Sequence, residues 1–272
     1  MRWLIFSIGL MGYFHIAEAQ SGTETFPRGA RSMGMANANV TWNDAWSFFN
    51  NIGGLSRLEQ SQIVFGYDHR LDLEELTTLS AAAVFQKNNA AFGVGVSSFG
   101  SDFFSQNQLG IGVSNHLGIA SLGIKINYFQ TSIEGFGTGR AAVLEVGGVA
   151  ELSPELFFGA HIYNPTRARY GRFSQDHLPT VVKAGLSYRP SEKVSFQIEA
   201  EKDILLDPLL KMGLEYNFFN KVWGRTGVAS TTRSLFFGIG FHGKSLQIDY
   251  AMTQHPTLGN THHFSTNIRL RK

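Results

Sequence analysis

Apolar and polar residues alternate one by one along most of the chain after residue 60. From residue 120 to 128 the apolar positions are Ala120, Leu122, Ile124, Ile126 and Tyr128, and the residues between them are small or polar. The same alternation returns in residues 182–189, 194–201, 210–218, 246–253 and 264–271. Successive side chains of a β-strand point to opposite faces, so this period predicts strands with one apolar and one polar face.

The alternating segments predict about fourteen strands between residues 61 and 272. We expect them at residues 61–71, 75–87, 90–101, 104–117, 119–132, 140–153, 155–165, 179–190, 193–203, 208–219, 221–230, 234–243, 245–254 and 261–271. Tight turns are predicted at Asn88-Asn89, Pro190-Ser191, Asn220 and Gly243-Lys244. The longest connection, residues 166–178, is polar and is expected to be an extracellular loop.

The period alone fits both a soluble sandwich and a membrane barrel, since both have strands with one apolar face. Three features favour the barrel. The predicted strands reach roughly nine to twelve residues, which is enough to cross a bilayer at a tilt. Aromatic residues stand near the ends of apolar faces, as interfacial girdles require: Tyr128, Tyr188, Tyr216, Phe218, Tyr250 and Phe264. Many strand positions are glycine, as in a wall that curves or holds an inner plug closely: Gly110, Gly112, Gly147, Gly159, Gly213, Gly227, Gly238 and Gly240.

The N-terminus predicts export. Arg2 is followed by an apolar stretch over residues 3–16 and by Ala17-Glu18-Ala19, the pattern of a secretory signal peptide over residues 1–19. No later segment has the roughly 20 apolar residues of a transmembrane helix, so a membrane location requires a barrel. The chain contains no cysteine, which excludes disulfides and thiolate metal sites.

Composition supports an ordered β protein. Hydrophobic residues make up 43% of the chain, charged residues 16%, and glycine is abundant at 30 residues. The net charge of +2 and the lack of a basic cluster argue against nucleic acid as a partner. We therefore predict an all-β, antiparallel transmembrane β-barrel of about fourteen strands over residues 61–272.

Residues 20–60 differ from the rest and carry the most specific motif. Gly29-Ala30-Arg31 is followed by Gly34-Met35, then by Asp44, and finally by Asn51 with Gly54-Leu55. This arrangement resembles the N-terminal region of the FadL-type outer-membrane transporter superfamily, including its PorV/PorQ-like branch in the Bacteroidota. Ile52 and Gly53 stand where the pattern of that superfamily has Pro and Ala.

The resemblance implies a fourteen-stranded barrel in the outer membrane of a Gram-negative bacterium, in particular a member of the Bacteroidota. It also implies that residues 20–60 fold inward as a plug or hatch. The small residues of this segment suit close packing, and its asparagines suit hydrogen bonds to a polar wall. The simpler alternative is a segment that only caps one mouth of the barrel.

Charged residues fall on the polar phase of the predicted strands and are expected to face the lumen: Lys125, Glu145, Glu151, Lys183, Glu199, Glu201, Lys211, Glu215, Asp249 and Arg269. They could line a selective channel or form ion pairs that fill the barrel around its plug, because an unpaired buried charge costs several kcal/mol. The mixture of signs favours the ion-pair network.

Catalysis and metal binding find little support. The histidines are scattered, Asp68 and His69 are expected on opposite strand faces, and His262-His263 has no recognisable third ligand. We expect no enzyme, no cofactor and no metal.

Two functions remain open. PorV-like members of the superfamily serve type IX protein secretion, and its transporters carry small hydrophobic molecules. The chain is short and leaves little room for large extracellular loops that would build a ligand vestibule. We therefore expect a non-enzymatic accessory component of a type IX secretion or assembly complex, with outer-membrane lipid and export or assembly proteins as partners. The alternative is plug-gated passage of small hydrophobic molecules.

Overall fold

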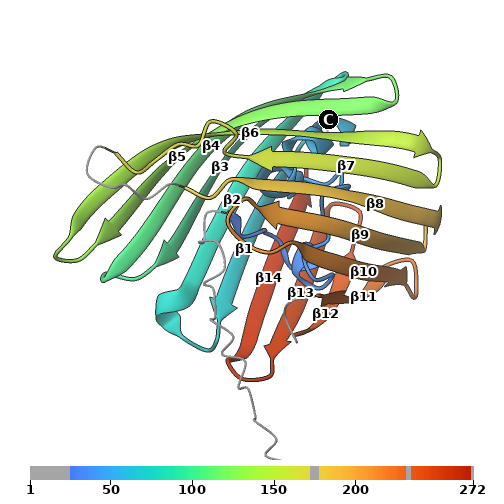
Figure 1. Ribbon diagram of the computed structural model, residues 1–272. Coiled ribbons are helices and arrows are strands. Elements are labelled where there is room, and N and C mark those ends of the chain that lie inside the picture. Colours follow the sequence, from blue (N-terminus) through green and yellow to red (C-terminus); the bar gives the residue numbers. More distant parts are fainter. Residues whose placement is uncertain (1–24, 172–177, 231–233, 271–272) are drawn as a thin grey trace, which may run out of the picture.

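The computed structural model describes residues 25–171, 178–230 and 234–270, and its strands close into a single barrel (Figure 1). The fourteen strands are β1 (Gln62–Arg70), β2 (Thr77–Lys87), β3 (Ala90–Gly100), β4 (Phe104–Leu117), β5 (Ala120–Ile133), β6 (Gly137–Ser153), β7 (Leu156–Tyr163), β8 (Val181–Ser191), β9 (Val194–Asp203), β10 (Leu209–Asn217), β11 (Val222–Ala229), β12 (Leu235–His242), β13 (Leu246–His255) and β14 (Gly259–Arg269).

Every strand pairs antiparallel with its sequence neighbours, and β14 closes the barrel on β1. The closing register joins Gln62 to Arg269 at one end and Arg70 to Thr261 at the other. The prediction of an antiparallel barrel of about fourteen strands is confirmed, and each predicted strand has its counterpart. The largest difference is at β6, which begins at Gly137 rather than at residue 140.

The predicted turns at Asn88-Asn89, Asn220 and Gly243-Lys244 lie between strands, and Asn88 and Asn220 adopt positive φ angles of 53° and 62°. Asparagine tolerates this left-handed conformation better than most residues. The turn predicted at Pro190-Ser191 was wrong. These residues belong to the end of β8, where the register with β9 shifts between Tyr188 and Ser191. Proline has no N–H to donate, and a strand bulge accommodates it.

The connections differ between the two ends of the barrel. At the end where β1 begins, the turns are short, such as the one between Lys87 and Ala90. At the opposite end the connections are longer, and the longest joins Tyr163 to Val181. In bacterial outer-membrane barrels the short turns are periplasmic and the longer loops extracellular. We call the two ends periplasmic and extracellular accordingly.

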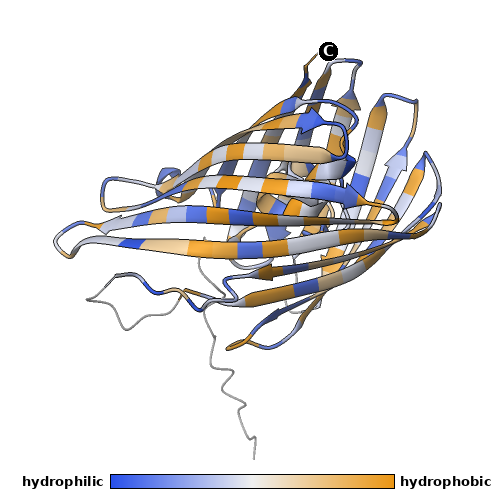
Figure 2. Ribbon diagram, turned by 90° about the horizontal axis from the view of Figure 1, so that it is seen from above, coloured by the Kyte–Doolittle hydropathy of each residue, from blue (hydrophilic) through white to orange (hydrophobic). Residues whose placement is uncertain are grey.

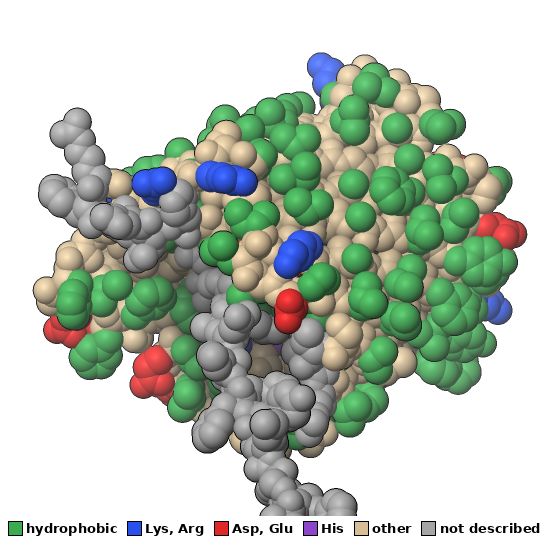
Figure 3. Space-filling model, viewed as in Figure 1, with side chains coloured by type: hydrophobic (Ala, Val, Ile, Leu, Met, Phe, Trp, Pro, Cys, Tyr) green, Lys and Arg blue, Asp and Glu red, His purple; other side chains and the backbone are tan. Residues whose placement is uncertain are grey.

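The two faces of each strand have opposite character, visible as alternating colours along the ribbons (Figure 2). Outward side chains are large, apolar and exposed, such as Phe65 at 50% and Ile111 at 52%. Inward charged side chains are buried, such as Lys125 at 1% and Glu145 at 2%. Apolar side chains cover much of the visible outer wall in Figure 3, with few charges among them. A soluble protein does not expose apolar surface on this scale, so the wall suits a lipid environment.

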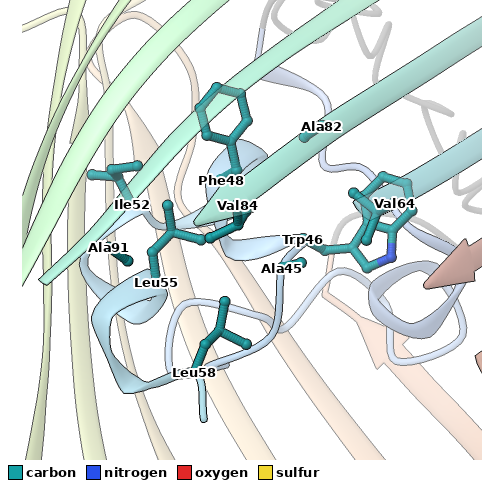
Figure 4. Packing of buried hydrophobic residues seen from close by; sticks show 10 residues of the cluster. All are labelled: Ala45, Trp46, Phe48, Ile52, Leu55, Leu58, Val64, Ala82, Val84 and Ala91. Carbon is teal, nitrogen blue, oxygen red and sulfur yellow. The ribbon is translucent and has the colours of Figure 1, made fainter. Parts of the chain in front are cut away.

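Residues 25–60, here called the inner segment, lie inside the barrel. They form two single-turn helices, α1 (Ala30–Met33) and α2 (Ser47–Asn50), and the 3₁₀ helix η2 (Ile52–Arg57). A second short 3₁₀ helix, η3 (Glu74–Leu76), precedes β2. Trp46, Phe48, Ile52 and Leu55 of the inner segment pack against apolar side chains of β1–β3, as Figure 4 shows.

None of the helices in the described residues has the length and apolarity needed to cross a membrane. The predicted signal peptide, residues 1–19, lies outside the described residues.

Candidate functional site

The inner segment approaches the wall most closely at glycines, where the wall has no side chain. Met35 lies against Gly213 of β10 and Gly227 of β11, and Phe48 lies against Gly93 and Gly95 of β3. Seven of the eight glycines singled out from the sequence face the inner segment in this way: Gly110, Gly112, Gly147, Gly159, Gly213, Gly227 and Gly238. The eighth, Gly240, lies against Arg225 and Asp249 instead. Glycine lets the backbone of the inner segment approach the backbone of the wall directly.

The structure brings the nine motif residues of the inner segment together within the barrel: Gly29, Ala30, Arg31, Gly34, Met35, Asp44, Asn51, Gly54 and Leu55. Gly29 has a φ of +94° and lies against the Trp46 ring, where a Cβ would come within 2.7 Å. Ala30 donates its N–H to Ser265 Oγ of β14 at 3.0 Å. Both contacts fix the start of α1 against its surroundings.

Asn51 is the hydrogen-bonding centre of the motif. Its Nδ2 donates to the Val40 carbonyl and, at 3.1 Å, to the Gly148 carbonyl of β6, while its Oδ1 accepts from Gly53 N–H at 3.1 Å. Gly53 itself lies directly against Gly147 and Gly148, so a methyl group there would collide with the β6 backbone. This contact gives a physical reason for glycine at a position where the FadL-type pattern has alanine.

An ion-pair network joins the inner segment to β10–β13. Arg31 reaches Glu215 of β10 with Nη2–Oε1 at 2.6 Å and Asp44 with Nη1–Oδ2 at 3.2 Å. Glu215 also accepts from Arg225 Nε of β11 at 2.5 Å, and Arg225 Nη1 donates to Asp249 of β13 at 2.7 Å. The Arg31 guanidinium stacks on the Trp42 ring at 3.5 Å. This network lies at the inner segment's contact with the wall, where Glu215, Arg225 and Asp249 are buried and the side chains of Arg31 and Asp44 are 19% and 17% exposed.

Burial shifts the pKa values of Asp44 and Arg31 in opposite directions, because it disfavours the charged form of each side chain. Burial raises the pKa of Asp44 above its ordinary value, and the neighbouring Arg31 offsets only part of that rise. Burial alone would lower the pKa of Arg31, but the charge and hydrogen bond of Glu215 raise it above its ordinary value. Arg31 therefore stays charged, and Asp44 is the more readily neutralised member of the pair.

A second cluster links the inner segment to β8–β10. Glu199 Oε2 accepts the backbone N–H groups of Asn39 at 2.7 Å and Val40 at 2.8 Å, and its Oε1 lies 3.3 Å from Lys211 Nζ. Lys211 also pairs with Glu201, which lies 3.5 Å from Lys183. Glu199 thus replaces water for two backbone donors of the inner segment while its own charge is matched by Lys211.

A third cluster of charged and polar side chains lies on β5–β7, next to α2 of the inner segment. Lys125 Nζ donates to the Phe48 carbonyl at 2.8 Å and lies 3.0 Å from Glu145 Oε1. Glu145 also contacts His161 Nε2 at 3.0 Å and accepts from Asn127. The lysine thereby ties the carbonyl end of α2 to the barrel wall.

Eight of the ten charged residues that were predicted to face the lumen lie in these three clusters: Lys125, Glu145, Lys183, Glu199, Glu201, Lys211, Glu215 and Asp249. Arg269 lies apart from them. It is half-buried near the periplasmic end and donates to the Lys244 carbonyl at 3.4 Å. Glu151, also on the polar phase, is 43% exposed and pairs with Arg57 at 3.2 Å. Its position near the end of β6 explains its contact with water.

Arg225, the cation that bridges the two carboxylates of the network on β10–β13, was not among the predicted lumenal residues. Arg225 contacts both Glu215 and Asp249, and its polar-phase position in β11 was the available signal.

The sequence also did not predict the pairing of Asp68 on β1 with His263 on β14, whose Oδ1 and Nδ1 atoms are 2.8 Å apart. His69 and His262, the sequence neighbours of that pair, lie on the outward face, so the two members of each adjacent pair point to opposite faces of the wall. No group of three or more metal-ligating side chains was found among residues 25–171, 178–230 and 234–270.

The extracellular half of the lumen contains an inward-facing apolar cluster. We call it the vestibule cluster: Phe129, Ala141, Val143, Tyr163, Leu178 and Val181, with Ala168 and Tyr170 packed against it. The last two and Leu178 belong to the long connection before β8, which the sequence predicted as a polar extracellular loop. Its described residues fold against the lumen wall, where Asn164 Nδ2 donates to the Leu178 carbonyl at 3.0 Å.

Little free space separates the vestibule cluster from the inner segment. The cavity between Phe26, Phe49, Glu145, His161 and Tyr163 measures about 10 Å³, roughly the space of one water molecule. Arg28 lies on the extracellular side of the inner segment. Its Nε donates to Ser97 Oγ of the wall at 3.3 Å, and its Nη1 donates to the Phe26 carbonyl of the inner segment at 2.9 Å. The inner segment and its ionic partners therefore fill the described lumen at this level.

Comparisons with solved structures identify the fold. The toluene transporter TbuX of Ralstonia pickettii matches with a TM-score of 0.72 at 12% identity, over 89% of this chain and 98% of that chain. The Pseudomonas putida toluene transporter TodX matches with a TM-score of 0.66 at 12% identity, over 88% of this chain and 96% of that chain. A FadL homologue of Pseudomonas aeruginosa matches with a TM-score of 0.64 at 12% identity, over 90% and 98% of the two chains.

No protein-family model matches the chain, and no curated protein matches its sequence. The similar solved structures are transporters and channels rather than enzymes. The chain has the fourteen-stranded fold of the FadL-type outer-membrane barrels.

Proposed function

We propose that the protein admits small hydrophobic molecules through the outer membrane of a Gram-negative bacterium, with the inner segment as its gate. The vestibule cluster carries this proposal. The lumen of an outer-membrane barrel is ordinarily polar, yet here several apolar side chains of β5–β8 face inward at the extracellular end. An apolar stretch of lumen wall with few polar groups suits an uncharged hydrophobic ligand.

The fold supports the same proposal. TbuX and TodX are described as toluene transporters, and CymD as a monoaromatic hydrocarbon channel. For this chain we propose the same broad class of cargo, small apolar molecules. An outer-membrane location agrees with the apolar outer wall. Export by a signal peptide over residues 1–19 and an origin in the Bacteroidota stay predictions.

Passage requires the inner segment to move, because it fills the lumen below the vestibule. A disulfide that ties the inner segment to the wall, and that a reductant can open, tests this requirement; we call it the lock. Gly34 of the inner segment lies against Gly238 of β12, where a Cβ on Gly34 would be 3.0 Å from the Gly238 Cα. The chain has no cysteine of its own, so the double variant Gly34→Cys, Gly238→Cys offers a single possible disulfide, which would join the inner segment to β12.

We expect host cells that make this variant to take up radiolabelled toluene only after a reductant opens the disulfide. Wild-type protein should be insensitive to the reductant. A second variant, Val143→Asn, should lower uptake without a lock, because it places a polar side chain in the vestibule cluster. Equal uptake by locked and reduced protein, with the disulfide verified by mass spectrometry and the barrel by its heat-dependent gel mobility, would refute the gate.

The filled lumen also favours a second candidate, a non-conducting partner in an outer-membrane secretion or assembly complex. The Arg31–Glu215 ion pair and the hydrogen bonds of Glu199 and Lys125 to its backbone hold the inner segment to three parts of the wall, as a rigid scaffold would require. Affinity purification from the native outer membrane separates the candidates. Stable recovery with large export components, and no toluene uptake, would favour the scaffold, including the predicted type IX role.

A further inference from the structure

A large groove crosses the outer wall from β13 through β14 and β1 to β5. Its volume is about 960 Å³. Most of its outward-facing lining is apolar and includes Phe65, Leu79, Val96, Leu109, Tyr128 and Phe264. Because these side chains lie on the lipid-facing phase of the strands, the groove opens toward the membrane and is separate from the lumen.

A row of polar side chains bounds the groove on its extracellular side. Ser98, Asn107 and Gln130 line the groove, and Arg140 is the next residue along the row. The four positions are cross-strand neighbours: Ser98 pairs with Asn107, Asn107 with Gln130, and Gln130 with Arg140. Adjacent strands are about 4.8 Å apart, so the row spans three strand spacings across β3–β6.

The row lies at the boundary between apolar and polar outer surface. The neighbouring row toward the periplasm is apolar and pairs Val96 with Leu109 and Leu109 with Tyr128. The row toward the extracellular side contains Ser132 and Thr138, whose hydroxyl oxygens are 3.0 Å apart. A change from apolar to polar outward side chains is what the boundary between acyl chains and headgroups selects in a membrane barrel.

Arg140 carries an outward charge that finds no ion-pair or hydrogen-bond partner among residues 25–171, 178–230 and 234–270. Its side chain is exposed, and it forms no ion pair in the described part of the chain. An unpaired cation facing the membrane is unfavourable unless it reaches the interface or an anion. A second outer groove, of about 510 Å³ over β7–β11, is lined by Leu186, Phe196 and Met212 and has no comparable row of polar residues at its edge.

We propose that the first groove binds a phosphorylated acyl lipid of the outer leaflet. One acyl chain lies along the apolar groove, and a phosphate oxygen accepts hydrogen bonds from the Arg140 guanidinium. Asn107 and Gln130 supply further polar contacts to the headgroup. A guanidinium is well matched to phosphate, because its planar N–H groups can donate two parallel hydrogen bonds.

Native mass spectrometry of the full protein in detergent tests the proposal, with bisphosphorylated lipid A as the probe. We expect one lipid bound to wild-type protein and about tenfold weaker binding by Arg140→Ala, the effect of losing a hydrogen bond to a charged group. Ala81→Phe should weaken binding by filling the groove, since Ala81 lines it on β2. Lys202→Ala, an exposed outward cation on β9, and Ala160→Phe, an outward alanine on β7, are the matched controls.

Dephosphorylated lipid A separates the phosphate contact from acyl-chain binding. Wild-type protein should bind it as weakly as Arg140→Ala binds the phosphorylated form. The proposal is overturned if phosphate removal has no effect, or if the control variants lose binding as much as Arg140→Ala and Ala81→Phe. Heat-dependent gel mobility establishes that each variant has folded. Because the groove is outside the lumen, failure of this test leaves the proposed passage of hydrophobic molecules unaffected.

Discussion

Two glycines on the inward face of β6 have very different surroundings. A Cβ on Gly147 would collide with Asn51 Oδ1, while a Cβ on Gly139 would find its nearest neighbour, Tyr170 Cβ, at 3.4 Å. Gly147 is therefore required by contact with the inner segment, and Gly139 is not. At these two positions, glycine is thus needed only where the inner segment packs against the wall.

We expect Gly147→Ala to destabilise the barrel by about 1–3 kcal/mol through overpacking, and Gly139→Ala to change its stability little. Urea unfolding in detergent, followed by tryptophan fluorescence, measures both. Similar effects of the two substitutions would contradict the close contact between Asn51 and β6.

The raised pKa of Asp44 gives a pH dependence with a definite sign. The native state holds the Asp44 proton at a pH where the unfolded chain has lost it, so this residue's contribution to stability falls as pH rises from about 4 through the raised pKa. Asp44→Asn should remove that component of the pH dependence. Unfolding free energies between about pH 4 and 6, with Asp102→Asn in an exposed turn as control, would show the flattened curve. An unchanged curve would mean that Asp44 does not titrate in this range.

At the scale of elements, Arg225 joins β10, β11 and β13 through its two carboxylate partners. Replacing it with methionine leaves Glu215 with only Arg31 and leaves Asp249 with only His242 among their described ion-pair partners. Loss of one member of a buried ion pair costs about 3–5 kcal/mol. Arg57→Met should cost less than Arg225→Met, because Arg57 has a single carboxylate partner, Glu151, which is 43% exposed, and its other hydrogen bonds go to neutral acceptors.

Chemical unfolding of the two variants provides the comparison. Adding Asp249→Asn to Arg225→Met should recover part of the lost stability, since it removes the charge that was left uncompensated. If the double variant were no more stable than Arg225→Met alone, the arginine would act through packing rather than through charge.

The strands were predictable because their periodicity is local. The alternation along Leu122, Ile124 and Ile126 requires no knowledge of distant residues, and it identified the lipid-facing side of β5. The role of Arg225 was not predictable in the same way. Its partners lie 10 and 24 positions away, and only the barrel register brings them together. The contacts of the long connection before β8 were not predictable for a related reason: its apolar residues are isolated in sequence and meet the vestibule cluster only after the barrel closes.

At the scale of the whole molecule, the filled lumen predicts that ions do not pass through the barrel. Wild-type protein in a planar bilayer should show no stable ionic conductance, because the cavity beside the inner segment is only about 10 Å³. Deleting residues 30–57 should open a conducting pore, since these residues fill the periplasmic half. A stable conductance of wild-type protein similar to that of the deletion variant would show that ions bypass the inner segment.

The strands differ greatly in length around the barrel. β6 has 17 residues and leans with β4 and β5 toward one side of the molecule (Figure 1), while β11 and β12 have 8 each. At about 3.4 Å per residue and a tilt of about 45°, these strands span about 41 Å and about 19 Å along the membrane normal. The apolar band of such a barrel is about 25 Å tall. The bilayer beside β11 and β12 must therefore thin, or the barrel must lean, so that hydrophobic mismatch sets its orientation in the membrane.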